Sequence, residues 1–234
     1  MQAVILCAGL GTRLRPITET VPKVMVPIGG KPLLLHQIEH LKKYGVKEFF
    51  INLHYLPEAI TDYFGDGSKF GVRINYSLEP ELLGTAGALK KFGPQLGEEF
   101  ILVYGDVFNR VDFTQLVEYY NSKKPCLGVH VVAHTEHSFD SDLAILDPDM
   151  RFQKIYQKPH QDLPAADFYD MQGIYILNKK ILASVPEGYH ELDHQLLPAV
   201  IANGGAYYGY PVQVSDYVHD IGTHDRYEKI KDRK

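Results

Sequence analysis

Short runs rich in β-branched and aromatic residues alternate along the chain with segments whose apolar residues recur at helical spacing. The runs predict strands at 2–7, 48–55, 72–77, 99–106 and 125–133. The intervening segments predict helices at 31–45, 57–64, 84–92 and 112–120, with Asp112 as the N-cap of the last. Strands separated by helices imply right-handed crossovers and a mainly parallel sheet. The predicted fold class is therefore α/β: a three-layer, Rossmann-like, mixed but mainly parallel sheet.

The pattern changes after residue 133, where strands follow one another across charged or proline-containing turns. Strands are predicted at 143–148, 151–158, 168–177 and 206–213, and helices at 191–203 and from 223 to the end. We expect one domain over 1–234, made of a first half (1–133), an extension (134–222) and a C-terminal helix (223–234). We expect the extension to hold a second ligand next to the ligand that the first half binds.

Composition excludes several classes of protein. A net charge of -5 over 234 residues argues against a general binder of nucleic acid or anionic membranes, so any anion site must be local. Cys7 and Cys126 lie too far apart to suggest a disulfide framework or a zinc site. No apolar run approaches the ~20 residues that span a bilayer. We expect a soluble, cytoplasmic protein.

The segment GLGTRLRP, residues 9–16, directly follows the first predicted strand. A dinucleotide fingerprint would need a glycine at position 14, where the chain has Leu14, and a Walker A loop would end in Gly-Lys-Ser/Thr. Both are therefore excluded. Gly9 and Gly11 permit close approach of the backbone to a ligand, while Arg13 supplies fixed positive charge.

Two further charged residues belong to the same predicted region. Lys23 follows Pro22, and we expect that segment to be extended and not helical. Asp106, like the glycine-rich loop, directly follows a predicted strand, and ligands of such sheets bind at the carboxyl ends of the strands. The sequence thus predicts an anion site at this edge.

Five motifs in order together resemble the sugar-1-phosphate nucleotidylyltransferases, also called nucleotide-sugar pyrophosphorylases. They are GxGTRxRP at 9–16 with Pro22-Lys23, LGTAGAL at 83–89, GDV at 105–107, QKP at 157–159 and DIGT at 220–223. The resemblance covers nearly the whole chain and implies the nucleotide-diphospho-sugar transferase fold. It also implies a reaction in which a sugar 1-phosphate attacks the α-phosphate of a nucleoside triphosphate and releases pyrophosphate.

Charge is the physical difficulty of that reaction, since the two substrates together carry roughly six negative charges. The attacking phosphate is already ionised near neutral pH, so positioning and electrostatics should suffice without a general base. The resemblance gives Arg13, Lys23, Asp106 and Lys158 catalytic roles, Lys158 by holding the sugar phosphate. It gives Asp106 and Asp220 the role of Mg²⁺ ligands. The residues expected to bind nucleotide are Leu6, Ala8, Gly9, Gly11, Thr12, Arg13, Lys23, Gly84 and Thr85, with Thr85 also capping a helix.

The chain departs from the family pattern mainly where the sugar should bind. Asp142 stands where many relatives have Tyr-Gly-Val, Gln157 replaces a glutamate, and Gln172 precedes Gly173 in place of Asn-Ala-Gly. The predicted sugar site consists of Asp142, Gln157, Lys158, Gln172 and Gly173. No tryptophan precedes Asp220. Glu79 and Glu81 are weaker candidates for contacts with base or ribose, whereas the eleven histidines, among them His36, His40 and His194, are interpreted as packing or surface residues.

The motifs favour GTP, with UTP, CTP or dTTP as alternatives. LGTAGAL and KPLLLHQIE resemble mannose-1-phosphate guanylyltransferases, whereas SDL and KPH resemble relatives that act on heptose 1-phosphates. We expect a monomer or homodimer without the left-handed β-helix that many relatives append. A metal-dependent glycosyltransferase would normally carry Asp-x-Asp, which GDVFN lacks. A non-catalytic nucleotide-sugar sensor is the remaining alternative, although the four charged residues expected of an enzyme are all present.

Overall fold

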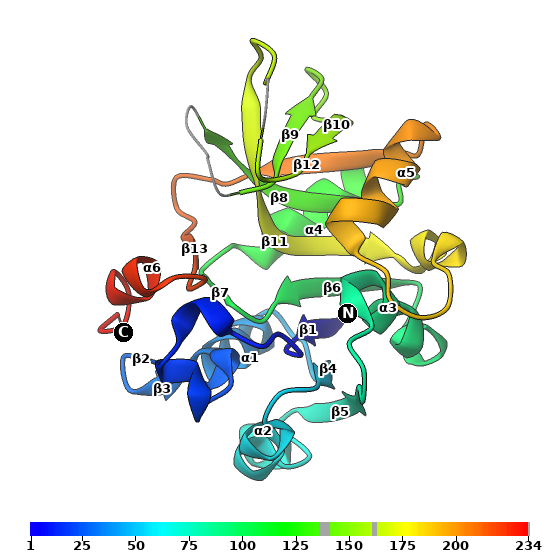
Figure 1. The fold of residues 1–234 in the computed structure, drawn as a ribbon. Helices are drawn as coiled ribbons and strands as arrows, with labels where there is room; N and C mark the ends of the chain where they lie inside the picture. Colours follow the sequence, from blue (N-terminus) through cyan, green and yellow to red (C-terminus); the bar gives the residue numbers. More distant parts are fainter. Residues whose placement is uncertain (136–140, 161–162, 234) are drawn as a thin grey trace. The chain divides into compact units, whose positions relative to one another are not determined.

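The computed structural model describes residues 1–135, 141–160 and 163–233, and these form two compact units (Figure 1). The first unit contains Met1–Leu82, Ile101–Phe113 and Asp216–Lys234, and the second contains Leu83–Phe100 and Thr114–Ser215. The first unit is therefore built from three separate stretches of chain. The division at residues 133 and 222 stays a prediction.

Parallel strands form the centre of the first unit. β1 (Gln2–Leu6) pairs with β4 (Glu48–Leu53), which pairs with β5 (Arg73–Leu78), and both pairings are parallel. β6 (Glu99–Tyr104) lies on the other side of β1. The helices α1 (Leu33–Lys43) and α2 (Pro57–Phe64) connect these strands along the chain, and the middle of β1 and of β4 is buried. The predicted α/β alternation is confirmed.

Short elements complete the first unit. β7 (Val107–Asn109) pairs antiparallel with β13 (Val218–Asp220), and β2 (Pro27–Ile28) pairs with β3 (Lys31–Pro32). The helix α6 covers only His224–Glu228, so the predicted C-terminal helix is wrong in length. The unit also contains the 3₁₀ turns η1 (Thr12–Leu14), η2 (Ile17–Glu19), η3 (Lys23–Met25) and η4 (Ser68–Phe70).

The second unit is a mixed sheet with helices. β11 (Phe168–Asn178) pairs antiparallel with β8 (Gly128–Thr135) and with β9 (Leu143–Leu146), which pairs antiparallel with β10 (Phe152–Tyr156). β12 (Tyr207–Pro211) runs parallel to β8. The helices and turns of the second unit include α3 (Gly84–Phe92), η5 (Gly93–Gln95), α4 (Phe113–Ser122) and η6 (Lys179–Ser184).

One predicted helix of the second unit is divided. The segment 191–203 forms a π-helical turn, η7 (Leu192–Leu196), followed by α5 (Leu197–Ala202). Pro198 lacks the N–H that would donate to the carbonyl of His194 in a regular α-helix, so the hydrogen-bond ladder is interrupted there. Among the helices of the described stretches, none is both long and apolar enough to cross a membrane.

Candidate active site

The glycine-rich loop begins where β1 ends and turns at Gly11. Gly11 has a φ of 65°, and a Cβ there would lie 3.1 Å from Cγ2 of Thr18, so a larger residue would be strained and crowded. Thr18, which is fully buried, donates from Oγ1 to the Gly11 carbonyl at 2.7 Å. A Cβ on Gly9 would meet no heavy atom within 4 Å. The fold therefore fixes the turn at Gly11 and leaves open space beside Gly9.

Leu14 anchors this loop in the interior. Its side chain is fully buried in a cluster with Phe108 of β7 and Ile221, which directly follows β13. Thr12 and Arg13, its neighbours in η1, are not buried. Leu14, which rules out a dinucleotide fingerprint, is thus a core residue. Its burial fixes the position of its neighbour Arg13 near the two predicted metal ligands, Asp106 and Asp220.

Lys23 and Asp106 form an ion pair in the first unit. Nζ of Lys23 lies 2.5 Å from Oδ2 of Asp106, with side chains 13% and 29% exposed. Burial raises the pKa of Asp106, but the charge and hydrogen bond of Lys23, together with the charge of Arg13, outweigh it and the pKa is lowered. Asp106 is therefore an ionised carboxylate at neutral pH.

The prediction of an extended segment at Lys23 is wrong, since Lys23 begins the 3₁₀ turn η3. Proline restricts the residue that precedes it, not the one that follows. Pro22 itself is extended, with φ -58° and ψ 144°, and the turn starts directly after it.

Pairing of β7 with β13 brings the two aspartates together. Asp220 is the register partner of Val107, and the N–H of Ile221 donates to the carbonyl of Asp106 at 2.9 Å. A Cβ on Gly222 would lie 2.7 Å from Oδ1 of Asp220 and 3.1 Å from Nη2 of Arg13. Arg13, Lys23, Asp106 and Asp220 are therefore assembled in one place within the first unit.

Arg226, which none of the five motifs contains, is paired with Asp220. Its Nη1 lies 2.9 Å from both carboxylate oxygens, and the N–H of Gly222 donates to Oδ1 at 2.8 Å. The Thr223 hydroxyl accepts from the Arg226 N–H at the start of α6. Arg226 lies beyond the end of the motif DIGT, so the sequence offered no signal for this contact.

The two carboxylates suit a hard divalent cation. Mg²⁺ typically takes one or two carboxylates and completes its octahedron with substrate phosphates and water. Among the described residues there is no group of three or more histidine, cysteine, aspartate or glutamate side chains able to hold a metal. Asp106 and Asp220 therefore suit a Mg²⁺ site whose remaining ligands would be substrate phosphates and water, and Mg²⁺ binding stays a prediction.

Leu6 and Ala8 flank the end of β1. The Leu6 carbonyl accepts from the N–H of Gly105 at 2.9 Å, and Ala8 is buried. Glu79 is buried and accepts from the Asn52 amide at 2.9 Å, so it is a structural residue and not a solvated one. Glu81 is exposed.

In the second unit, α3 begins at Gly84 as predicted, but Thr85 does not cap it. Leu83 occupies the N-cap position, and the carbonyl of His190 accepts from the N–H groups of Ala86 and Gly87. The Thr85 hydroxyl donates to Oε2 of Glu191 at 2.8 Å and accepts from the N–H of Leu192 at 2.6 Å. Thr85 therefore ties α3 to the segment that enters η7.

A Cβ on Gly84 would lie 2.6 Å from the carbonyl oxygen of His190, and the φ of Gly84 is 69°. This position consequently requires glycine for the packing of α3. The motif LGTAGAL thus has a structural explanation inside the second unit, and its contact with a base stays a prediction.

The predicted sugar residues Asp142, Gln157 and Lys158 are neighbours in the second unit. Oδ1 of Asp142 accepts from the N–H of Lys158 at 3.0 Å, and Oδ2 lies 2.8 Å from Nε2 of His194. The Gln157 amide donates to the His194 carbonyl at 2.7 Å. His194, interpreted from the sequence as a packing or surface residue, has an exposed side chain and contacts both Asp142 and Gln157. His36 and His40, by contrast, are buried and hydrogen-bond to backbone carbonyls.

Gln172 and Gly173 lie where the pairing of β11 with β8 is irregular. The register shifts between Met171 and Tyr175, and Gly173 has a φ of 66°. Such a bulge re-aims the side chains of a strand and favours glycine. The N–H of Met171 donates to the Asp142 carbonyl at 3.2 Å, so the bulge begins directly beside a residue of the predicted sugar site.

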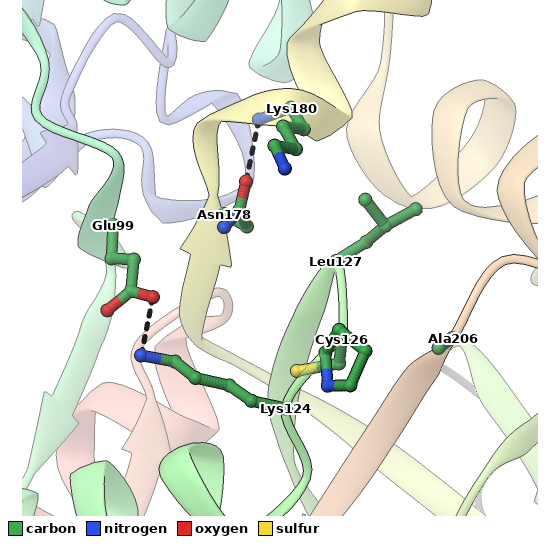
Figure 2. A pocket seen from close by; sticks show the side chains of 8 residues that line it. Glu99, Lys124, Cys126, Leu127, Asn178, Lys180 and Ala206 are labelled. Carbon is green, nitrogen blue, oxygen red and sulfur yellow. Dashed lines mark hydrogen bonds and ion pairs between the residues drawn. The ribbon is translucent and has the colours of Figure 1, made fainter.

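The second unit also carries a pocket of about 530 Å³ that contains none of the predicted site residues (Figure 2). Figure 2 shows the ion pair between Lys124 and Glu99 and the hydrogen bond from the Lys180 N–H to the Asn178 side chain. Nζ of Lys124 lies 2.6 Å from Oε1 of Glu99. The other lining residues are Pro125, Cys126, Leu127 and Ala206. Lys124 pairs with Glu99, and Lys180 is the second lysine among the lining residues.

The sequence of the chain matches a known protein family. The family model described as "Nucleotidyl transferase" matches residues 2–233. The chain belongs to the nucleotidyl transferase family. This membership confirms the resemblance drawn from the five motifs.

Relatives within the nucleotidyl transferase family differ in the nucleotide that they use. A UTP–glucose-1-phosphate uridylyltransferase of Synechocystis is 32% identical over 222 residues, covering 89% of this chain and 57% of the relative. A D-glycero-α-D-manno-heptose 1-phosphate guanylyltransferase of Campylobacter jejuni is 43% identical over 129 residues, covering 55% of this chain and 57% of the relative. The chain thus spans less than two thirds of the length of these relatives.

A solved structure of this family has nearly the same extent as the chain. HddC from Yersinia pseudotuberculosis, in a complex with GMP-PN, superposes with a TM-score of 0.82 at 27% identity and covers 99% of this chain and 98% of its own. The similarity confirms the α/β fold class.

Proposed function

We propose that this member of the nucleotidyl transferase family transfers a nucleotidyl group, with GTP as donor and a sugar 1-phosphate as acceptor, in an Mg²⁺-dependent reaction. The products would be a nucleotide sugar and pyrophosphate. The observation that carries the proposal is the assembly of Arg13, Lys23, Asp106 and Asp220 in one place, beside a loop whose Gly9 borders open space.

Two cations, Arg13 and Lys23, would serve the nucleotide. Arg13, held by buried Leu14, presents a planar fork of donors that suits the phosphates of a triphosphate. Lys23 supplies a second positive charge from a side chain that is only 13% exposed, where electrostatic interactions are less screened than in bulk water. Both would stabilise the negative charge that develops on the leaving pyrophosphate.

Asp106 and Asp220 would hold the metal. Bound Mg²⁺ supplies charge neutralisation and polarisation of phosphoryl oxygens. Lys23 keeps Asp106 ionised, in keeping with the lowered pKa of that carboxyl, and Arg226 pairs directly with Asp220. Lys23 and Arg226 can each exchange a carboxylate partner for a phosphate partner when substrates enter.

The acceptor would be held by the group around Lys158, which adjoins Gln157 in the chain and whose N–H donates to Asp142. Mannose 1-phosphate and a heptose 1-phosphate are the acceptors that the motifs favour. The attacking oxygen is ionised near neutral pH, so this chain's residues need only position it.

Two comparisons support GTP over other nucleotides: the heptose 1-phosphate guanylyltransferase and the solved structure bound to GMP-PN. UTP is the alternative, because the uridylyltransferase relative covers more of the chain. Cytoplasmic location and a monomeric or homodimeric state belong to the same proposal.

A matrix of four nucleoside triphosphates against several sugar 1-phosphates, with Mg²⁺ and a pyrophosphate assay, tests the proposal. We expect the fastest release with GTP and a manno-configured acceptor, and loss of release when EDTA removes the metal. Binding of nucleotide without pyrophosphate release from any pair would instead indicate a non-catalytic sensor.

A further inference from the structure

Two polar side chains of the second unit contact His194. Its ring contacts Asp142 at 2.8 Å, and its carbonyl accepts from the Gln157 amide at 2.7 Å. Both contacting residues occupy positions where the chain departs from the family pattern. The departures from the family pattern at Asp142 and Gln157 are therefore linked, because both side chains hydrogen-bond to His194.

Pro198 removes the α-helical partner of the His194 carbonyl. In a regular α-helix it would accept from residue 198, which is Pro198 and has no N–H. The Gln157 amide makes that missing hydrogen bond, which a glutamate at 157 could not do when ionised. Gln157 thus stabilises the π-helical turn η7 that carries His194.

Exposure decides which of these side chains a ligand can reach. The Asp142 side chain is only 14% exposed, and both its oxygens are engaged, Oδ1 by the N–H of Lys158 and Oδ2 by His194. The His194 side chain is 40% exposed. The imidazole is therefore the more accessible of the two groups, and a direct contact between Asp142 and the sugar stays a prediction.

The contact also orients the ring. With Nε2–H donating to Asp142, a neutral imidazole keeps Nδ1 as an acceptor. Among the hydrogen bonds of the described stretches, none involves Nδ1. The Asp142 carboxylate thus fixes both the ring of His194 and the backbone of Lys158. The acceptor atom Nδ1 of His194 therefore belongs to the same hydrogen-bonded cluster as Lys158, the lysine predicted to hold the sugar phosphate.

We infer that His194 is a specificity-determining residue that accepts a hydrogen bond from a hydroxyl of the sugar 1-phosphate, with Asp142 and Gln157 as positioning residues. The inference rests on the proposed function. It names a substrate contact that none of the five motifs contains, since His194 lies outside all of them.

Steady-state kinetics with GTP and either mannose 1-phosphate or D-glycero-α-D-manno-heptose 1-phosphate test this inference. In His194→Gln, the amide still donates to Asp142 but Nδ1 is lost, so we expect the KM for the sugar 1-phosphate to rise about tenfold or more. The KM for GTP should stay within twofold. His134→Gln, which changes an exposed histidine of β8 in the same unit, is the matched control and should leave both values unchanged.

Asp142→Ala provides a second test through positioning. Because Asp142 orients His194 as well as the backbone of Lys158, the double variant Asp142→Ala/His194→Gln should raise the KM for the sugar 1-phosphate no further than Asp142→Ala alone. Unchanged KM for the sugar 1-phosphate in His194→Gln, with wild-type turnover intact, would overturn this inference alone. Failure of the wild type to release pyrophosphate would overturn the proposed function and this inference with it.

Discussion

Nζ of Lys23 lies 2.5 Å from Oδ2 of Asp106, and neither side chain is more than a third exposed. Replacing Lys23 by Ala removes a cation from the proposed phosphate site, so we expect kcat for pyrophosphate release to fall about 10²–10³-fold. The assay uses GTP and mannose 1-phosphate. Lys231→Ala is the control, because Lys231 pairs with Glu228 at the exposed surface and should leave kcat unchanged. Turnover of Lys23→Ala within threefold of wild type would contradict the assigned role.

Leu14→Ala should destabilise the protein because it empties part of the buried cluster with Phe108 and Ile221. We expect the free energy of unfolding to fall by about 2–5 kcal/mol in urea denaturation. The KM for GTP should also rise, since Leu14 anchors Arg13. Leu10→Ala, at a side chain of the same loop that is 41% exposed, should change stability by less than about 0.5 kcal/mol. Equal effects of the two substitutions would mean that Leu14 is not an anchor.

Thr85→Val keeps the shape of the side chain but loses both hydrogen bonds to residues 191 and 192. We expect a loss of about 1–3 kcal/mol in unfolding free energy, because the Leu192 N–H and the Glu191 carboxylate lose a partner. Thr85→Ser retains the hydroxyl and should recover most of the loss. If Val and Ser behave alike in thermal unfolding, the hydroxyl does not stabilise this junction.

His130 should make the protein sensitive to acid. It is fully buried among aromatic rings, with its ring centroid 3.9 Å from that of Tyr175, and burial lowers its pKa from 6.5 to about 3. A lowered folded pKa means that the unfolded chain binds the proton first as the pH falls below 6.5. Stability is therefore full above pH 6.5 and decreases progressively toward pH 3.

His130→Phe tests this pH dependence, since phenylalanine cannot take up a proton. Between pH 7 and pH 4 the wild type should lose about 3 kcal/mol more unfolding free energy than the variant. Denaturation curves at several pH values give the comparison. Parallel pH profiles of the two proteins would show that His130 does not set the acid sensitivity.

The regular elements and the glycine-rich loop could be predicted from the sequence. The apolar and aromatic run at 48–53 and the helical spacing at 33–43 carry local signals that the structure confirms. A dinucleotide-binding loop requires a glycine at position 14, and the chain has Leu14 there, so the spacing alone excludes such a loop. These features are local, so propensity and spacing are enough to find them.

The contacts that complete each site could not be predicted in this way. β7 and β13 are three-residue strands of ordinary composition, separated by more than 100 residues along the chain. The pairing of Asp220 with Arg226, and that of Asp142 with His194, depends on side chains that only the tertiary structure brings together. The capping role predicted for Thr85 is wrong for the same reason, because its hydroxyl has distant partners that compete with capping.

Residues that follow β13 complete a hydrophobic cluster of the first unit. Ile221, Tyr227 and Ile230 belong to the same buried cluster as Leu14, although Leu14 is synthesised more than 200 residues earlier. During translation this cluster therefore cannot be complete until residues 221–230 have been synthesised. Asp220 directly precedes Ile221, so the second predicted metal ligand is made together with the residues that complete this hydrophobic cluster.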